Sequence, residues 1–133
     1  MIVADTNLLV YLYVRGQWTE QAEAALARDP VWVAPLLWRS EFRNTLIGMF
    51  RRGAFGIDEA LRVTGEAEQA IRGHEYTVQS DQVLRLAAQS GCSAYDCEFV
   101  ALARDLGVRL VTSDRPILAA FPDTAIALAL FAR

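Results

Sequence analysis

Short apolar segments alternate with longer helical patterns along this chain, and this alternation constrains the fold more than any other feature. Residues 2–4 are too few for a helix and are typical of a buried strand in a parallel sheet. Further strands are predicted at residues 31–34, 76–78 and 108–112, whereas residues 124–130 suit either a strand or a helix. Helices are predicted from about residue 8, from residue 19, and over residues 35–52, 57–71, 80–88, 94–106 and 116–121. We therefore expect an α/β fold, a three-layer α/β/α sandwich around a central parallel sheet of four to five strands.

The size and patterning of the chain predict a single domain over residues 1–133. A length of 133 residues is usual for one domain, and no repeat or linker divides the sequence. The longest apolar run, residues 125–132, is far shorter than the roughly 18 residues of a membrane span. Because the first residues also lack the pattern of a secretory signal, we expect a cytoplasmic protein with no membrane contact.

The kinds of basic residue restrict the possible chemistry. All 13 basic residues are arginine, which excludes sites that need a lysine, such as a Walker A loop or a Schiff base. His74 is the only histidine, and Cys92 and Cys97 do not have metal-site spacing. The net charge of −3 means that any contact with nucleic acid depends on a local arginine patch. Catalysis would therefore use carboxylates, hydroxyls, arginines or a bound metal ion.

Two acidic residues directly follow predicted strands. Asp5 ends the first strand, and Asp114 comes just after the strand at residues 108–112. In open parallel sheets, ligands bind in the crevice beyond the carboxyl ends of the strands. If the two strands are neighbours, both carboxylates face that crevice.

Two further acids lie in predicted helices, and each has an ordinary structural explanation. Asp96 is in the first turn after Ser93, where a carboxylate also simply stabilises the positive end of the helix. Glu41 lies one turn after Trp38 on a mostly uncharged face, where a salt bridge or plain exposure would also account for it.

Taken together, the four acids predict a metal site. Carboxylates that crowd together repel one another and need a cation to remain ionised. Mg²⁺ and Mn²⁺ prefer carboxylate and water oxygens. Such an ion activates water and stabilises charge on a phosphodiester, which fits hydrolysis of a nucleic-acid backbone.

Four segments of the chain together form a recognisable pattern: Asp5-Thr6-Asn7, Ser40-Glu41, Ser93-Ala94-Tyr95-Asp96 with the apolar residues 99–103 behind it, and residues 110–115. In this order they resemble the PIN-domain family, most closely the VapC-type toxins of toxin–antitoxin pairs. The resemblance runs from residue 2 to about residue 118. Its specificity lies in the order and spacing of the segments along a chain of this length.

The resemblance implies a Mg²⁺- or Mn²⁺-dependent endoribonuclease that forms a homodimer and is neutralised by a cognate antitoxin protein. By resemblance, four acids take the catalytic and metal-binding positions: Asp5, Glu41, Asp96 and Asp114. Thr6 and Ser113 match neighbouring hydroxyl positions that support the ligands, and Asn7 matches a position that steadies the first loop.

Arginines are the candidates for binding the RNA phosphates, because a guanidinium binds phosphate in bidentate geometry. The candidates are Arg115, Arg43 and Arg39, although exposed helix faces would also explain them. The three tryptophans, Trp18, Trp32 and Trp38, are expected to pack in the core or in a dimer rather than stack on bases.

Two other functions compete with a nuclease. A phosphatase of the haloacid-dehalogenase type would use Asp5 as nucleophile, but it needs a second acid where Asn7 stands, and a lysine. The alternative is a non-catalytic PIN-like module that binds RNA or protein, although a degenerate site would be expected to have lost one of the four acids.

Overall fold

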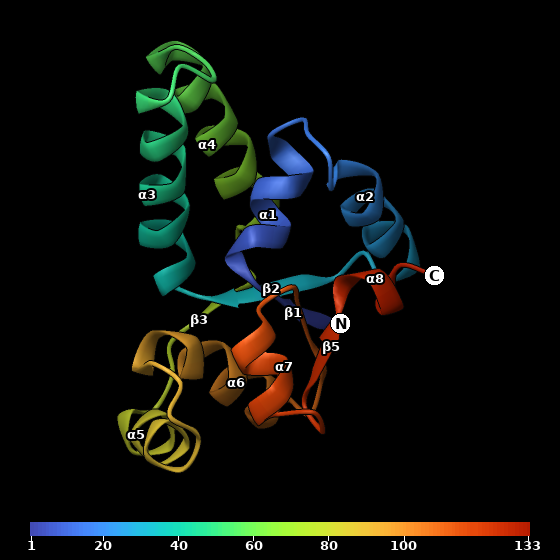
Figure 1. Cartoon of the computed structure of the whole chain (residues 1–133), viewed down its shortest axis with the longest axis vertical. Coiled ribbons are helices and arrows are strands. Elements are labelled where there is room, and N and C mark those ends of the chain that lie inside the picture. Colours follow the sequence, from blue (N-terminus) through green and yellow to red (C-terminus); the bar gives the residue numbers. More distant parts are fainter.

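The computed structural model describes all 133 residues and contains a five-stranded parallel sheet (Figure 1). The strand order is β3-β2-β1-β4-β5, and each neighbouring pair is parallel. The strands are β1 (Ile2–Ala4), β2 (Trp32–Pro35), β3 (Glu75–Tyr76), β4 (Leu110–Thr112) and β5 (Ala125–Ala127). The predicted fold class and strand number are therefore confirmed.

Helices cover both faces of the sheet, which makes the three layers (Figure 1). One face carries α1 (Thr6–Tyr13), α2 (Thr19–Arg28), α3 (Leu37–Arg51) and α4 (Ile57–Ile71). The other carries α5 (Ser80–Ser90), α6 (Ala94–Leu106) and α7 (Arg115–Ala120), and α8 (Leu128–Phe131) lies near the C-terminus. None of these helices combines the length and the apolar character needed to cross a bilayer.

The two layers of helices enclose one hydrophobic core of 32 buried residues. Trp38 and Phe42 of α3 are fully buried, with ring centroids 5.5 Å apart. Trp32 is also buried, so the expected core role of these two tryptophans is confirmed, whereas Trp18 remains 43% exposed. Trp38 and Phe42 hold α3 against the core on either side of Glu41 in the sequence.

Local capping explains where the helices of the site begin and end. The Ser93 hydroxyl accepts a hydrogen bond from the backbone N–H of Asp96 at 3.0 Å and so starts α6. Gly107 ends α6 with a φ of +67°, a left-handed conformation that a residue with a Cβ adopts at a cost. These caps place Asp96 in the first turn of α6, as predicted.

Some predicted boundaries were wrong by one to three residues. The strand predicted at residues 108–112 begins at Leu110, because the Val108 N–H bonds back to Ala103 at the end of α6. The helix predicted over residues 35–52 begins only at Leu37, since Pro35 is the last residue of β2. Residues 124–130 hold both β5 and the start of α8.

The strand order creates a crevice between β1 and β4. From β1 the chain proceeds to β2 and β3 on one side, and it returns to place β4 and β5 on the other side. Beyond the carboxyl ends of β1 and β4, at this change of direction, ligands bind in open parallel sheets. Asp5 follows β1 directly, and Asp114 follows β4 after Ser113.

Candidate functional site

The carboxylate of Asp5 is held at the crevice by both of its oxygens. Oδ1 accepts a hydrogen bond from the Thr6 backbone N–H at 2.8 Å, and Oδ2 accepts one from the Thr112 hydroxyl at 2.5 Å. Burial nevertheless raises the pKa of Asp5 to about 6, and the negative charges of Asp114 and Asp96 add to the rise. The site therefore holds this carboxylate in an environment that disfavours its charge.

Thr112 connects the two strand ends. Its buried hydroxyl donates to Asp5 and accepts a hydrogen bond from the backbone N–H of Asp114 at 3.0 Å. Asp114 in turn accepts from the Ile117 N–H at 3.0 Å through Oδ1 and so caps α7. This leaves Oδ2 of Asp114 without a hydrogen-bond partner within the protein, next to a fixed Asp5.

Glu41 reaches the same place from α3. Its Oε1 accepts a hydrogen bond from the Thr6 hydroxyl at 2.7 Å, and Thr6 immediately follows Asp5. Burial raises the pKa of Glu41, and the charges of Asp5, Asp96 and Glu98 raise it further. The hydrogen bonds of Thr6 to both Asp5 and Glu41 therefore place this helix carboxylate beside the strand-end acid Asp5.

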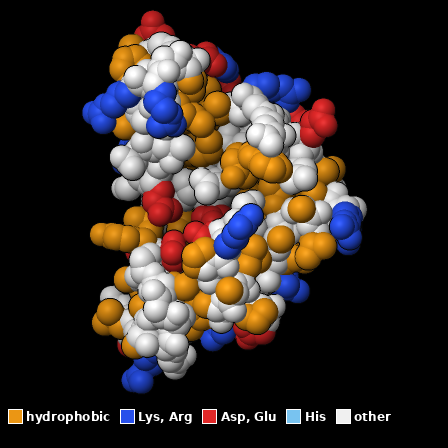
Figure 2. Space-filling view, in the orientation of Figure 1, with side chains coloured by type: hydrophobic (Ala, Val, Ile, Leu, Met, Phe, Trp, Pro, Cys, Tyr) orange, Lys and Arg blue, Asp and Glu red, His pale blue; other side chains and the backbone are white.

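Asp96 completes the group from the other helical layer. Burial is the main cause of its raised pKa, and the charge of Asp114 adds to it. Two residues further along α6, Glu98 is half-buried, and burial raises its pKa as well. Figure 2 shows acidic side chains gathered in a hollow at the middle of the molecule, between α1 and α3 above and α6 and α7 below.

None of the four acids at the crevice forms an ion pair with a cationic side chain. The ion pairs of the protein use other acids, namely Glu23, Asp29, Glu59, Glu66, Glu68, Glu75 and Asp123. The guanidinium of Arg39 is occupied: Nε and Nη2 donate to Glu75 at 2.6 and 2.8 Å, and Nη1 donates to Glu68 at 2.9 Å. Buried or half-buried carboxylates without a cationic partner are uncommon outside metal and catalytic sites.

Comparison with known proteins identifies the fold family. The family model described as "PIN domain" matches residues 2–121. The chain belongs to the PIN-domain family. It is also 33% identical over 124 residues to Ribonuclease VapC3 of Pyrobaculum aerophilum, with 91% of this chain and 95% of that protein covered.

Solved structures agree with a PIN-domain fold. The crystal structure of PAE2754 from Pyrobaculum aerophilum matches with a TM-score of 0.78 at 23% identity, covering 98% of this chain and 92% of that one. FitAcB from Neisseria gonorrhoeae matches with a TM-score of 0.75 at 16% identity, covering 97% and 99%. At these identities the likeness concerns the fold alone.

The acids of this PIN domain offer the carboxylate oxygens that a divalent cation prefers, although they do not surround one ion completely. No group of three acidic, histidine or cysteine side chains lies close enough to surround one ion directly, so four-fold direct ligation is not seen. Asp5, Glu41 and Asp114 each have at least one oxygen that accepts a hydrogen bond from a hydroxyl or backbone donor. Mg²⁺ commonly keeps several waters and binds one or two carboxylates directly, which this set of free oxygens allows.

The residues predicted to support the site differ in what they contact. Thr6 is buried and links Asp5 to Glu41, as described above. Ser113 is exposed and lies near Tyr11, whose pKa is raised mainly by burial and also by the charge of Asp5. Asn7 is exposed, and no hydrogen bond involves its side chain, so it does not steady the loop through a side-chain contact.

Three residues near the site were not predicted: Thr112, Glu98 and Tyr11. Thr112 had a recognisable signal, since it is the single hydroxyl residue in the strand and precedes Asp114 by two positions. Glu98 had none, because a glutamate in a helix is usually solvated. The position of Tyr11 depends on how α1 packs and could not be read from its neighbours in sequence.

Proposed function

We propose that this PIN domain is a Mg²⁺- or Mn²⁺-dependent endoribonuclease that acts as the toxin of a toxin–antitoxin pair. The observation that supports it best is the gathering of four acids without a cationic partner at the crevice between β1 and β4. The chain's 33% identity to a protein named ribonuclease agrees with this reading of the acids.

In this proposal the four carboxylates hold the cation between them, partly through water. The residues are Asp5, Glu41, Asp96 and Asp114. A divalent cation bound there would lower the pKa of a coordinated water and offset the charge that develops on the phosphodiester. The raised pKa values of Asp5, Glu41 and Asp96 fit this role, because a nearby cation would remove the cost of keeping these groups ionised.

The hydroxyl residues orient the carboxylates. Thr112 donates to Asp5 and positions the start of the Asp114 loop, and Thr6 directs Glu41 toward the crevice. Because these hydrogen bonds already orient the carboxylates, binding of the cation would cost little conformational entropy.

Of the arginines, we retain Arg115 as the contact to an RNA phosphate. It is exposed, directly follows Asp114 and has no ion pair. Arg39 forms ion pairs with Glu75 and Glu68, so its guanidinium is not free to bind an RNA phosphate. Arg43 is exposed but lies two positions from Glu41, so the two side chains do not face each other on α3.

Cleavage of labelled RNA tests the proposal. Wild-type protein should cut RNA with Mg²⁺ or Mn²⁺ and stop when EDTA is added, and Asp96→Asn should lower kcat at least about a hundredfold. Asp105→Asn, an exposed acid without an ion pair at the other end of α6, is the matched control and should cut normally. No cleavage by folded protein with either metal would instead favour a non-catalytic module that binds RNA or protein.

With the toxin role we propose that a cognate antitoxin protein binds the chain and that two copies form a homodimer in the cytoplasm. The single core supports the proposal that residues 1–133 act as one domain. Expression without the partner should arrest growth of a host cell, and co-expression of the partner should restore it. Normal growth while the cell contains active, folded protein would contradict the toxin role and leave the nuclease in place.

A further inference from the structure

A groove of about 470 Å³ opens at the same edge of the sheet as the acidic site. Its walls come from the residues that follow two strands and from two helices of the other layer: Leu36 follows β2, Thr77 and Val78 follow β3, Leu84 belongs to α5, and Ala94 and Glu98 belong to α6. Since all strands are parallel, the groove extends the crevice from β1 toward the β3 edge.

The groove and the acids share their supporting helices. Leu36 immediately precedes α3, which carries Glu41, and Ala94 begins α6, which carries Asp96. Glu98 lines the groove, and its charge acts on Glu41. An RNA strand with one phosphate over the acids would therefore have a neighbouring nucleotide within reach of the groove.

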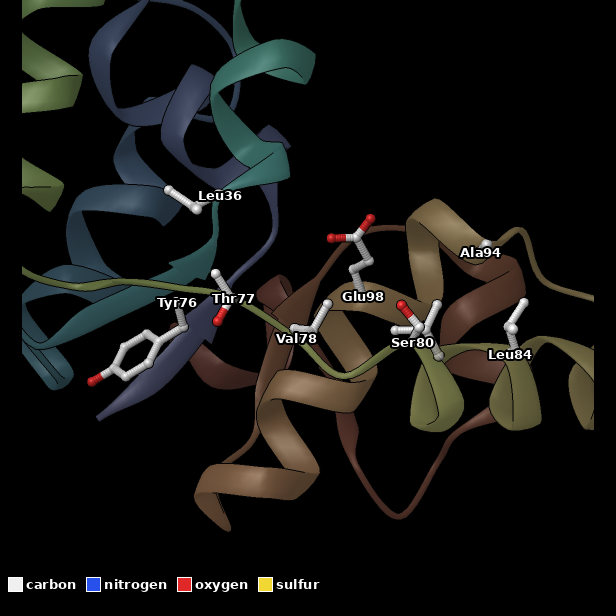
Figure 3. A pocket seen from close by; sticks show the side chains of 9 residues that line it. Leu36, Tyr76, Thr77, Val78, Ser80, Leu84, Ala94 and Glu98 are labelled. Carbon is white, nitrogen blue, oxygen red and sulfur yellow. The ribbon is translucent and has the colours of Figure 1, made fainter.

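Glu98 is the one charged residue among those that line the groove, and most of the others are apolar. It is half-buried, and no hydrogen bond or ion pair within the protein uses its carboxylate. In Figure 3 this carboxylate rises from α6 into the open space between Leu36 and Ala94. In its ionised form a carboxylate there can only accept hydrogen bonds, and it repels phosphate.

A nucleobase of the proposed RNA substrate fits this lining, because it combines flat faces with N–H donors on one edge. Guanine alone among the four RNA bases presents two adjacent donors, N1–H and N2–H, that match the two oxygens of a carboxylate. We propose that the groove binds a guanine base next to the scissile phosphate, with the Glu98 carboxylate accepting hydrogen bonds from N1–H and N2–H. This inference rests on the proposed ribonuclease function and names a specificity determinant for it.

The test compares RNAs that differ in one functional group. Cleavage sites are first mapped on a long RNA, and synthetic RNAs are then made with guanine or inosine at each position near the cut; inosine lacks the N2 amino group. At one position, wild-type kcat/KM should favour guanine about tenfold to a hundredfold. Glu98→Gln should bring this ratio close to one, because an amide cannot accept at both positions.

The ratio is measured within each variant, so it does not depend on the overall activity of that variant. Glu20→Gln, at an exposed glutamate of α2, should keep the wild-type ratio. Val78→Trp fills the groove and should also abolish the preference. A guanine-to-inosine ratio near one in the wild type, or a ratio that Glu98→Gln leaves unchanged, overturns the inference.

Binding of the same RNAs by fluorescence anisotropy separates this inference from the proposed function. Tighter binding of the guanine RNA without any cleavage would refute the nuclease and leave the groove assignment standing. Cleavage without a guanine preference would support the nuclease and refute the assignment of the groove to guanine. If another protein chain fills the groove, Val78→Trp will change the sedimentation coefficient and leave the guanine-to-inosine ratio unaltered, which also overturns the inference.

Discussion

Replacing Asp5 by asparagine should stabilise the metal-free protein at neutral pH. A rise in the pKa of Asp5 from its ordinary 3.8 to about 6 corresponds to about 3 kcal/mol of destabilisation of the folded state when the group is ionised. Asp5 keeps part of its surface in solvent, so we take this figure as an upper limit. The asparagine retains the bond from the Thr6 N–H, but the Thr112 hydroxyl loses its acceptor, which costs about 1 kcal/mol.

The sign of the effect depends on pH. Between about pH 4 and 6 the folded protein keeps a proton on Asp5 that the unfolded chain releases, so a rise in pH through this window destabilises the folded state. Below pH 4 both states are protonated and the penalty vanishes. We therefore expect Asp5→Asn to be more stable than wild type by about 1–2 kcal/mol at pH 7.5 and slightly less stable at pH 4.

Urea unfolding in EDTA, followed by tryptophan fluorescence, measures this difference at several pH values. Asp105→Asn removes one exposed negative charge and controls for the net charge of the chain. Glu41 and Asp96 are present in both proteins, but the charge of Asp5 contributes to the raised pKa of Glu41, so the difference also includes the relief of this repulsion. A difference between Asp5→Asn and wild type that is the same at pH 4 and pH 7.5 would refute the reasoning.

Three other predictions follow from the contacts at the site. Millimolar Mg²⁺ or Mn²⁺ should raise the Tm of wild type and not that of Asp5→Asn, because only a folded site binds the ion; an equal rise in both, by differential scanning fluorimetry, would argue against the site. Thr112→Val should cost about 1–3 kcal/mol in urea unfolding and lower RNA cleavage, since it leaves Asp5 and the Asp114 N–H without their shared partner. Arg39→Met should cost about 1–3 kcal/mol, because it leaves Glu75 without its cation, while the KM for RNA stays unchanged; a raised KM would return Arg39 to the substrate surface.

Local patterns in the sequence were enough to predict the layers of the fold. Residues 2–4 and the acids after two strands were recognised because strand length, side-chain periodicity and helix caps depend on interactions within a few residues. Ser93 is an example, since its hydroxyl caps α6 by accepting a hydrogen bond from the backbone N–H of Asp96, three residues further along. Errors were confined to boundaries, as at Val108, where a hydrogen bond to the preceding helix shortened the strand.

Contacts between elements could be decided only by the tertiary structure. The Thr112 hydroxyl meets Asp5 although 107 positions separate them, and Thr6 meets Glu41 across 35 positions. Arg39 was a candidate for substrate contact from its place on α3. The packing of α3 beside β3 instead brings its guanidinium into an ion pair with Glu75. Such pairs depend on how whole helices and strands are placed against one another, a placement set by the shared core and not by the residues adjacent in sequence. The sequence therefore determined which acids end strands and begin helices, while only the packed structure determined that no arginine neutralises them.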